Sequence, residues 1–396
     1  MRQFHYPLWL DQVATTGTPA FVVLFVLDTF TRAILVTVVP LQALRVLGDA
    51  QKVSLFYLGI SIAGLVGVLS VPWLVRRLRR RWVTSLSTVF LCAAAPLLAS
   101  GTIGGLIGGL ALHTIGAATL SICLNLYVLD HIRPKGLTRF EPMRMLFTGT
   151  TWTVAPVLGI YLSKYAGQWA PYAASAGFAL ILLGYFWFLR MTENSLLATS
   201  SRSPANPLRF IGRYFSQPRL LLAWFLAVGR GGWWMMFFIY TPIYAVTSGL
   251  EPETSGWIVA AGSSSMFVVT FWGKIGRRYG LRRLMIAGYT VTGLLMLCVG
   301  AASGTLWLSI AFLLAGCLAA SAIDGAGNVP FLRAVRPRER PEMTTVFSSY
   351  RDVAKLTMPG LFALVLNHFA LPAVFVTSGV IMLVMAVYSR RIPRSL

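Results

Sequence analysis

Twelve long apolar runs constrain this chain more than any other feature. Each run has about 20 residues or more, the length of α-helix that crosses the roughly 30 Å hydrocarbon core of a bilayer. The runs occupy residues 19–44, 52–75, 82–100, 103–129, 142–164, 169–189, 218–247, 254–275, 282–302, 305–331, 343–368 and 371–389. A soluble domain has roughly 25% charged residues, whereas this chain has 12%. The sequence therefore predicts an all-α membrane protein with twelve transmembrane helices.

The chain contains two copies of a six-span unit. Equivalent residues recur at an offset of 201 to 203. Examples are Asn125 and Asn328, Pro156 and Pro359, and Pro40 and Pro242. We predict an N-terminal bundle at 1–189, a cytoplasmic linker at 190–217, which is rich in Ser, Pro and Asn, and a C-terminal bundle at 218–396. Such repeats are typical of transporters, with the substrate site between the repeats near the middle of the membrane.

Basic residues set the expected orientation. The net charge is +22, and most of it comes from arginine and lysine in alternate connections. These connections lie at 76–81, 133–139, 202–219, 277–283, 336–340 and 390–394. Because basic connections stay on the cytoplasmic side, we expect both termini in the cytoplasm and the protein in the inner (plasma) membrane. This placement explains the charge without any nucleic acid.

Four segments carry a family resemblance: "PWLVRRLRRRW" at Pro72, "GKIGRRYGLRR" at Gly273, span 5, and "LDTFT" at Leu27. They resemble motifs of the major facilitator superfamily, and the resemblance covers essentially the whole chain. The turn after span 8 is similar to the family pattern G-x-x-x-D-R-x-G-R-R, with Arg277 where the family has Asp. The turn after span 2 matches less well and has Arg76 at that position. Span 5, "GTTWTVAPVLGIYL", is similar to the family's antiporter motif, and "LDTFT" at Asp28 is similar to the opening of drug–proton antiporters.

The resemblance implies two pseudo-symmetric six-helix bundles. Spans 1, 4, 7 and 10 would surround a central cavity, spans 2, 5, 8 and 11 would flank it, and spans 3, 6, 9 and 12 would face lipid. It also implies a cytoplasmic gate near the basic turns. We expect the gate residues to be Arg76, Arg277, Arg278, Asn125 and Asn328.

Seven charged residues and one histidine fall in the middle third of the predicted spans, at 1.5 Å of rise per residue. They are Asp28, Arg32, Arg230, Asp324, Arg351, Asp352 and Lys355, together with His113. Spans 3, 6, 9 and 12 contain none of them. A charge at this depth costs at least about 2.5–3.5 kcal/mol unless it meets a partner or water, so these residues are candidates for function.

We assign provisional roles by chemistry. The acids and the histidine are the candidates for proton coupling: Asp28, Asp324, Asp352 and His113. The bases and nearby aromatic residues are the candidates for substrate binding: Arg32, Arg230, Arg351, Lys355, Trp152, Trp234, Tyr240 and Tyr350. Four bases against three acids leave a net positive layer, which suits a carboxylate or phosphate.

Each role has a structural alternative. Asp28 and Arg32, or Asp352 and Lys355, are close enough on one helix to neutralise each other. His113 is explained equally by a packed, hydrogen-bonded side chain, and the aromatic residues by ordinary packing. At offset 202 Asp28 corresponds to Arg230, which also suggests a salt bridge between the halves.

The sequence has no GxxxxGK[ST], HExxH or GxSxG motif, and its four histidines are scattered. We therefore expect no enzyme activity, no catalytic residues, no metal and no cofactor. We predict a monomeric secondary transporter in the lipid bilayer. It would move a small organic solute, anionic or amphipathic, by alternating access with proton coupling. The alternatives are a proton-antiporting multidrug efflux pump and a non-transporting membrane scaffold.

Overall fold

The computed structural model describes residues 17–132, 134–192, 210–336 and 340–392. Within these ranges the chain forms helices and turns and contains no β-strand. Eleven of the helical stretches there are long and apolar enough to cross a membrane. These observations confirm the predicted fold class. Most of the predicted linker lies outside the described residues.

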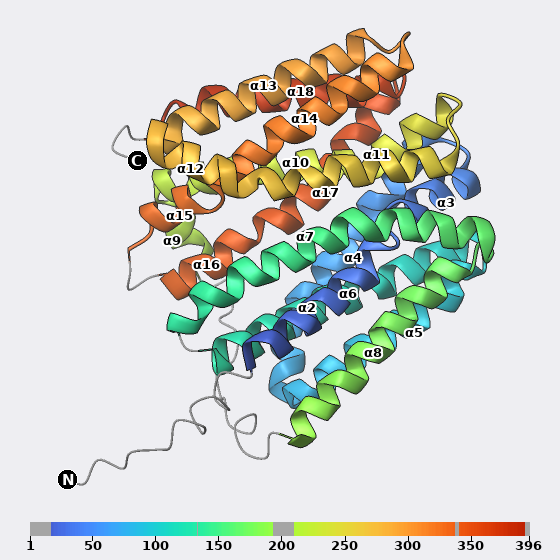
Figure 1. Ribbon diagram of the computed structural model, residues 1–396, viewed down its shortest axis with the longest axis vertical. Helices are drawn as coiled ribbons and strands as arrows, with labels where there is room; N and C mark the ends of the chain where they lie inside the picture. The colour runs from blue at the N-terminus through green and yellow to red at the C-terminus, as the bar shows by residue number, and fades with distance from the viewer. Residues whose placement is uncertain (1–16, 133, 193–209, 337–339, 393–396) are drawn as a thin grey trace.

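The helices form two groups that lie side by side (Figure 1). The first group contains α2 (Gly17–Ala33), α3 (Val38–Leu47), α4 (Ala50–Arg77), α5 (Arg80–Ala99), α6 (Ile103–His131), α7 (Pro134–Tyr165) and α8 (Ala170–Thr192). After the short α9 (Ile211–Phe215), the second group contains α10 (Pro218–Thr247), α11 (Pro252–Ser264), η2 (Ser265–Val268), α12 (Val269–Tyr279), α13 (Leu281–Ala301), α14 (Leu306–Ala326), α15 (Val329–Ala334), α16 (Arg340–Ser348), α17 (Tyr350–Leu366) and α18 (Pro372–Ser389).

The predicted span 11 corresponds to α16 and α17 and is the one span outside the eleven apolar helices. Helix α17 has 17 residues, and Arg351, Asp352 and Lys355 lie in its first two turns. The uncharged part of α17 is therefore short, because three charged residues lie in its first two turns. It packs against α4 of the first group and α10 of its own group, so its charged turns lie between the two groups.

Span 1 is broken between α2 and α3, and Pro40 explains the break. Proline has no N–H to donate to the Val36 carbonyl four residues earlier, and its ring crowds that oxygen. Across the break the Leu35 N–H donates to the Arg32 carbonyl at 3.2 Å. The Thr31 carbonyl is therefore free of the helical ladder and needs another donor.

Three more spans are interrupted, span 8 near its middle, span 10 near its end and span 11 near its beginning. Span 8 passes through the 3₁₀ helix η2. Span 10 turns at Gly327, whose φ of 53° is left-handed and therefore favours glycine. Span 11 is interrupted at Ser349, between α16 and α17. Such interruptions are common at functional hinges. All four broken spans belong to those expected to surround or flank the cavity.

We call the end of the molecule where α4, α12 and α15 finish the basic end. Arg77, Arg278 and Arg333 lie there. Figure 1 shows α12 and α15 at this end and α3 at the opposite one. The two helix groups meet mainly through α4 with α17 and α7 with α11.

Polar contacts join the two groups at the end opposite the basic one. Lys164 Nζ of α7 lies 2.9 Å from Glu253 Oε1 of α11. Gln51 of α4 donates a hydrogen bond of 2.9 Å to Asn367, just after α17. The groups are therefore closed against each other at this end.

Helix α7 crosses the break of span 1 at very short range. A Cβ atom at Gly159 would lie 2.0 Å from the Ile34 carbonyl oxygen, closer than any real contact. Glycine is required here because the two backbones touch. Gly159 belongs to the segment that resembles the antiporter motif, so that motif packs directly on the broken span.

Candidate functional site

Two polar clusters lie in the interior, one in each helix group. The first cluster consists of Asp28, Thr31, Arg32, His113 and Ser175, from α2, α6 and α8. The second cluster consists of Arg230, Trp234, Asp324, Asn328, Tyr350 and Arg351, from α10, α14, α15 and α17 and their junctions.

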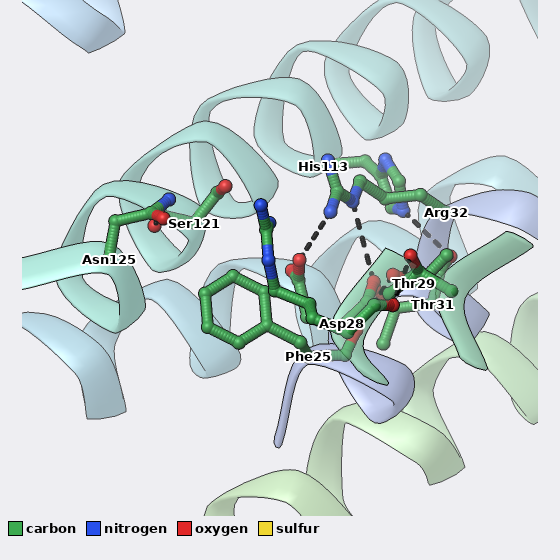
Figure 2. Close-up of polar contacts among 10 residues, drawn as sticks. Phe25, Asp28, Thr29, Thr31, Arg32, His113, Ser121 and Asn125 are labelled. Carbon is green, nitrogen blue, oxygen red and sulfur yellow. Dashed lines mark hydrogen bonds and ion pairs between the residues drawn. The ribbon is translucent and has the colours of Figure 1, made fainter. Parts of the chain in front are cut away.

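An ion pair on one helix forms the core of the first cluster. Arg32 pairs with Asp28 one turn earlier on α2 (Figure 2). The Asp28 side chain is fully buried, whereas that of Arg32 is 34% exposed. Asp28 Oδ1 has no hydrogen-bond partner among the described residues. One oxygen of the Asp28 carboxylate therefore accepts no hydrogen bond from these residues, and part of the Arg32 side chain is accessible to solvent or a ligand.

The break of span 1 is completed by side chains of the first cluster. His113 Nε2 lies 3.2 Å from the free Thr31 carbonyl oxygen, and Ser175 Oγ donates to the same oxygen at 2.7 Å. Because a carbonyl only accepts, His113 Nε2 carries the proton of this bond. Figure 2 shows His113 beside Arg32 above this segment. His113 thus holds the broken backbone, in agreement with its hydrogen-bonded alternative; a proton relay stays a prediction.

The second cluster joins spans 7, 10 and 11, and its ion pair connects two helices instead of lying on one. Arg230 Nε lies 3.5 Å from Asp324 Oδ1, and the other oxygen of Asp324 accepts a 2.8 Å hydrogen bond from Trp234 Nε1. The guanidinium also donates to Asn328 Oδ1 at 3.1 Å and to the Tyr350 hydroxyl at 3.3 Å. Arg230 thereby contacts both residues that follow the interruptions of spans 10 and 11.

Two cations converge on Tyr350. Its hydroxyl also accepts a 3.1 Å hydrogen bond from Arg351 Nε. The guanidinium carbons of Arg230 and Arg351 lie 5.6 and 5.5 Å from the centre of its ring. Asp324 balances only one of the two charges. Positive charge is therefore in excess around a neutral oxygen, which favours an anionic ligand.

Two expected ion pairs are not formed. Asp28 and Arg230 each pair within their own helix group, so the bridge between the halves that the repeat suggested is absent in this conformation. Among the described residues no ion pair within 4.0 Å joins Asp352 to Lys355. A direct ion pair between them is therefore absent in this conformation, although the two charges still interact electrostatically. Both side chains line a cavity between the helix groups instead.

Three of the four predicted aromatic residues lie near the charges. The ring of Trp152 on α7 packs 5.0 Å from that of Phe238 on α10, and Phe238 lies 5.7 Å from Trp234. These rings connect the two helix groups. Tyr350 belongs to the second cluster. Tyr240, in contrast, is fully buried, and its hydroxyl is bonded to Ser54 at 2.6 Å.

In the described part of the chain, no hydrogen bond or ion pair joins the expected gate residues to one another. Arg277 and Arg278 are exposed at the end of α12. Asn125 is exposed and donates to the Ser121 carbonyl on its own helix at 2.8 Å. Asn328, its equivalent in the repeat, contacts Arg230 instead. The side chain of Arg76 lies outside the described part of the chain.

Sequence reasoning missed Ser175 and Phe238. Ser175 lies in span 6, which the resemblance assigned to the lipid-facing set, so its polar side chain carried no weight. Phe238 is one aromatic residue among many in span 7. A helical projection of α10 places it four residues after Trp234, on the same face, and this spacing is the signal that was available.

Comparison with known proteins bears on the sequence family and the fold. The sequence model of the Major Facilitator Superfamily matches residues 21–271 and 252–395. No curated protein sequence matches the chain.

Several solved transporter structures have a similar fold. A D-xylose–proton symporter is 13% identical, with a TM-score of 0.73 over 96% of this chain and 98% of the other. The nucleoside transporter NupG is 12% identical, with a TM-score of 0.73 over 95% and 99%. A POT family transporter in complex with 5-aminolevulinic acid is 11% identical, with a TM-score of 0.74 over 95% and 96%. At these identities the likeness concerns the fold alone.

Proposed function

This chain belongs to the Major Facilitator Superfamily and is therefore a multi-pass membrane transporter rather than an enzyme, and we propose that it moves a small anionic or amphipathic organic solute by proton-coupled alternating access. In this proposal residues 1–189 and 218–396 are two bundles that rock about a central site.

The excess of positive charge at Tyr350 is the observation that carries the anionic part of the proposal. Arg230 is held by Asp324, but Arg351 is exposed and bonds to a neutral hydroxyl. An anionic group between the two guanidinium groups gains charge-assisted hydrogen bonds and relieves the repulsion between them.

The free oxygen of Asp28 supports proton coupling. A buried carboxylate that lacks a partner on one oxygen is destabilised in its charged form, and a proton bound there removes the charge. Protonation also releases Arg32, whose side chain already reaches the interior space. Proton binding at Asp28 and anion binding at the bases are thereby linked through charge.

Closure of the end opposite the basic one supports alternating access. We propose that the closed end faces outward and that the basic end faces the cytoplasm, as the distribution of arginine predicts. Cysteine introduced at Arg79 or Arg282 should resist a membrane-impermeant maleimide in intact cells, while cysteine at Glu251 should react. The reverse labelling pattern overturns this orientation.

Uptake into proteoliposomes under an imposed pH gradient tests the proposed function. The solutes should include monocarboxylates, organic phosphates, zwitterions and organic cations of similar size. We expect accumulation of an anionic or amphipathic solute that collapses when a protonophore removes the gradient. Accumulation of cations alone, or solute flux that ignores the gradient, contradicts the proposal.

Multidrug efflux is a second candidate because the rings of Trp152, Phe238 and Trp234 connect the helix groups. Aromatic surfaces bind lipophilic cations through cation–π contacts. Proton-driven efflux of ethidium from cells, lost in Trp152→Ala and Trp234→Ala, would favour this candidate over the anion carrier. If the protein is a non-transporting scaffold, substitutions in either cluster should alter its folding, and no solute flux should be detected in any variant.

A further inference from the structure

A cavity between the helix groups is largely apolar but has two charges at its edge. Its apolar lining comes from α4, α6 and α10, and includes Ile60, Leu65, Val68 and Leu110. Asp352 and Lys355 of α17 line it as well. The lining is thus suited to a ligand that is hydrocarbon on one side and ionic on the other.

The size of the cavity limits the hydrocarbon part of such a ligand. Its volume is about 120 Å³. An apolar cavity of about 150 Å³ holds a benzene molecule. A branched aliphatic group or at most a single ring therefore fills this space, whereas a fused ring system exceeds it.

The charges at the edge of the cavity are opposite and attract each other, but they form no direct ion pair. Asp352 and Lys355 are three residues apart on α17, yet no ion pair within 4.0 Å connects them in the described chain. The Lys355 backbone lies close to α4, because the Ser61 hydroxyl is 2.8 Å from its carbonyl oxygen and 2.7 Å from that of Tyr57, and its one proton is shared between them. An acid and a base are therefore held separately beside one apolar space.

We propose that this cavity binds a small amphipathic zwitterion of the amino-acid type. Its carboxylate pairs with Lys355, its ammonium pairs with Asp352, and its apolar group fills the space between α4 and α6. A ligand with only one charge pairs with only one of these two residues and lacks the second charge-assisted contact. This inference rests on the proposed transport function and narrows its solute class.

Ligands that share one apolar group test the inference. Leucine, isocaproate and isoamylamine carry the same isobutyl group. Leucine has both charges, isocaproate has only the carboxylate, and isoamylamine has only the ammonium group. Glycine keeps both charges and lacks the apolar group, and tryptophan has a fused ring. Binding to the purified full-length protein in detergent is measured by calorimetry and by thermal stabilisation.

We expect leucine to bind about tenfold or more tightly than each of the other four, because each lacks a charged contact, lacks the apolar contact or exceeds the space. Equal binding of isocaproate or isoamylamine means that one charge is not recognised and overturns the zwitterion. Equal binding of glycine or tryptophan means that the cavity does not hold the side chain. Absence of binding by leucine at millimolar concentration also overturns the proposal.

Variants locate the binding to this cavity. Ala118→Leu adds bulk to the lining from α6 and should abolish leucine binding, whereas Ala173→Leu, at an exposed position of α8, should not. Lys355→Gln and Asp352→Asn should each weaken leucine binding about tenfold. Lys355→Gln should leave the affinity for isoamylamine unchanged, and Asp352→Asn should leave the affinity for isocaproate unchanged. If Ala118→Leu is folded and binds leucine normally, the site lies elsewhere.

The binding measurement is independent of the proton-coupled function. It uses no membrane and no gradient, so leucine binding without pH-driven uptake would overturn proton coupling and keep the zwitterion site. Conversely, pH-driven uptake of isocaproate without leucine binding would keep the proposed function and overturn this inference.

Discussion

The two polar clusters occupy related positions in the two repeats but are built differently. In the first cluster the ion pair between Asp28 and Arg32 lies on one helix. In the second, Arg230 is bound by partners from α14, α17 and the turn before α15. A pair within one helix moves with that helix and is insensitive to rearrangement. A network that connects three spans changes whenever those spans move, so the second cluster is suited to sense conformation and the first to bind a proton.

The two repeats also differ in how their equivalent prolines affect the helix. Pro40 and Pro242 are equivalent in the repeat, yet α10 continues through Pro242 to Thr247 whereas span 1 breaks. In span 1 the released Thr31 carbonyl has His113 as a donor. At the equivalent offset of 203 the second repeat has Gly316, which has no side-chain donor. The other donor, Ser175, has an equivalent in Ser378, so at this proline the two repeats differ in the histidine donor.

The largest expected effect concerns transport and tests the proton site that we assign to the first cluster. Asp28→Asn should reduce pH-driven accumulation to the level measured without a gradient, because the proton site is lost. Exchange of solute across the membrane should persist. Uptake and counterflow in proteoliposomes measure both quantities, with Asp49→Asn, an exposed acid, as the control. Unchanged pH dependence would remove Asp28 from the coupling mechanism.

The next effect concerns stability. Asp324→Asn leaves the Arg230 side chain, which is 11% exposed, without its acid, and should lower the free energy of unfolding by about 3–5 kcal/mol. Asp28→Asn should cost no more than about 1 kcal/mol, because Arg32 reaches water. Denaturation in detergent measures both. The double variant Arg230→Gln with Asp324→Asn should recover part of the loss; equal costs for the two single variants would erase the proposed difference between the clusters.

Arg351→Gln should weaken binding of an anionic substrate by about 1.5–3 kcal/mol, the contribution of a charge-assisted hydrogen bond. Expression should persist, because removal of a surplus cation relieves repulsion at Tyr350. Equilibrium binding measures the loss, and Arg283→Gln at an exposed position of α13 is the matched control. Normal binding, or a variant that only fails to fold, makes Arg351 a structural residue.

The smallest effect tests the broken helix. His113→Leu removes one of two donors to the Thr31 carbonyl and should destabilise the protein by about 1 kcal/mol. His113→Gln retains an N–H donor and should be closer to wild type. Thermal denaturation compares them. If both variants keep full stability but lose pH-driven uptake, His113 acts in proton transfer instead.

The sequence predicts the fold well because burial in lipid requires long apolar helices, and these are visible in the runs themselves. It also identifies the spans that carry Asp28, Arg230 and Asp324. It does not predict their partners, since spacing along one helix is visible in sequence but contact between helices is not. Asn125 and Asn328 show the limit: the repeat makes them equivalent, but the turn at Gly327 brings only Asn328 to Arg230.

The unequal number of acids and bases in the interior has an electrical consequence. Four cations and three anions leave one positive charge when all are ionised. Carrying one elementary charge through the membrane potential changes the free energy by about 2.3 kcal/mol per 100 mV. In the proposed alternating-access mechanism, reorientation of the empty protein should therefore be electrogenic and favour the state in which this charge faces the negative compartment. A bound monoanion cancels this charge only while Asp28 stays ionised. If a proton binds Asp28 together with the monoanion, one positive charge remains and the loaded step stays voltage-dependent.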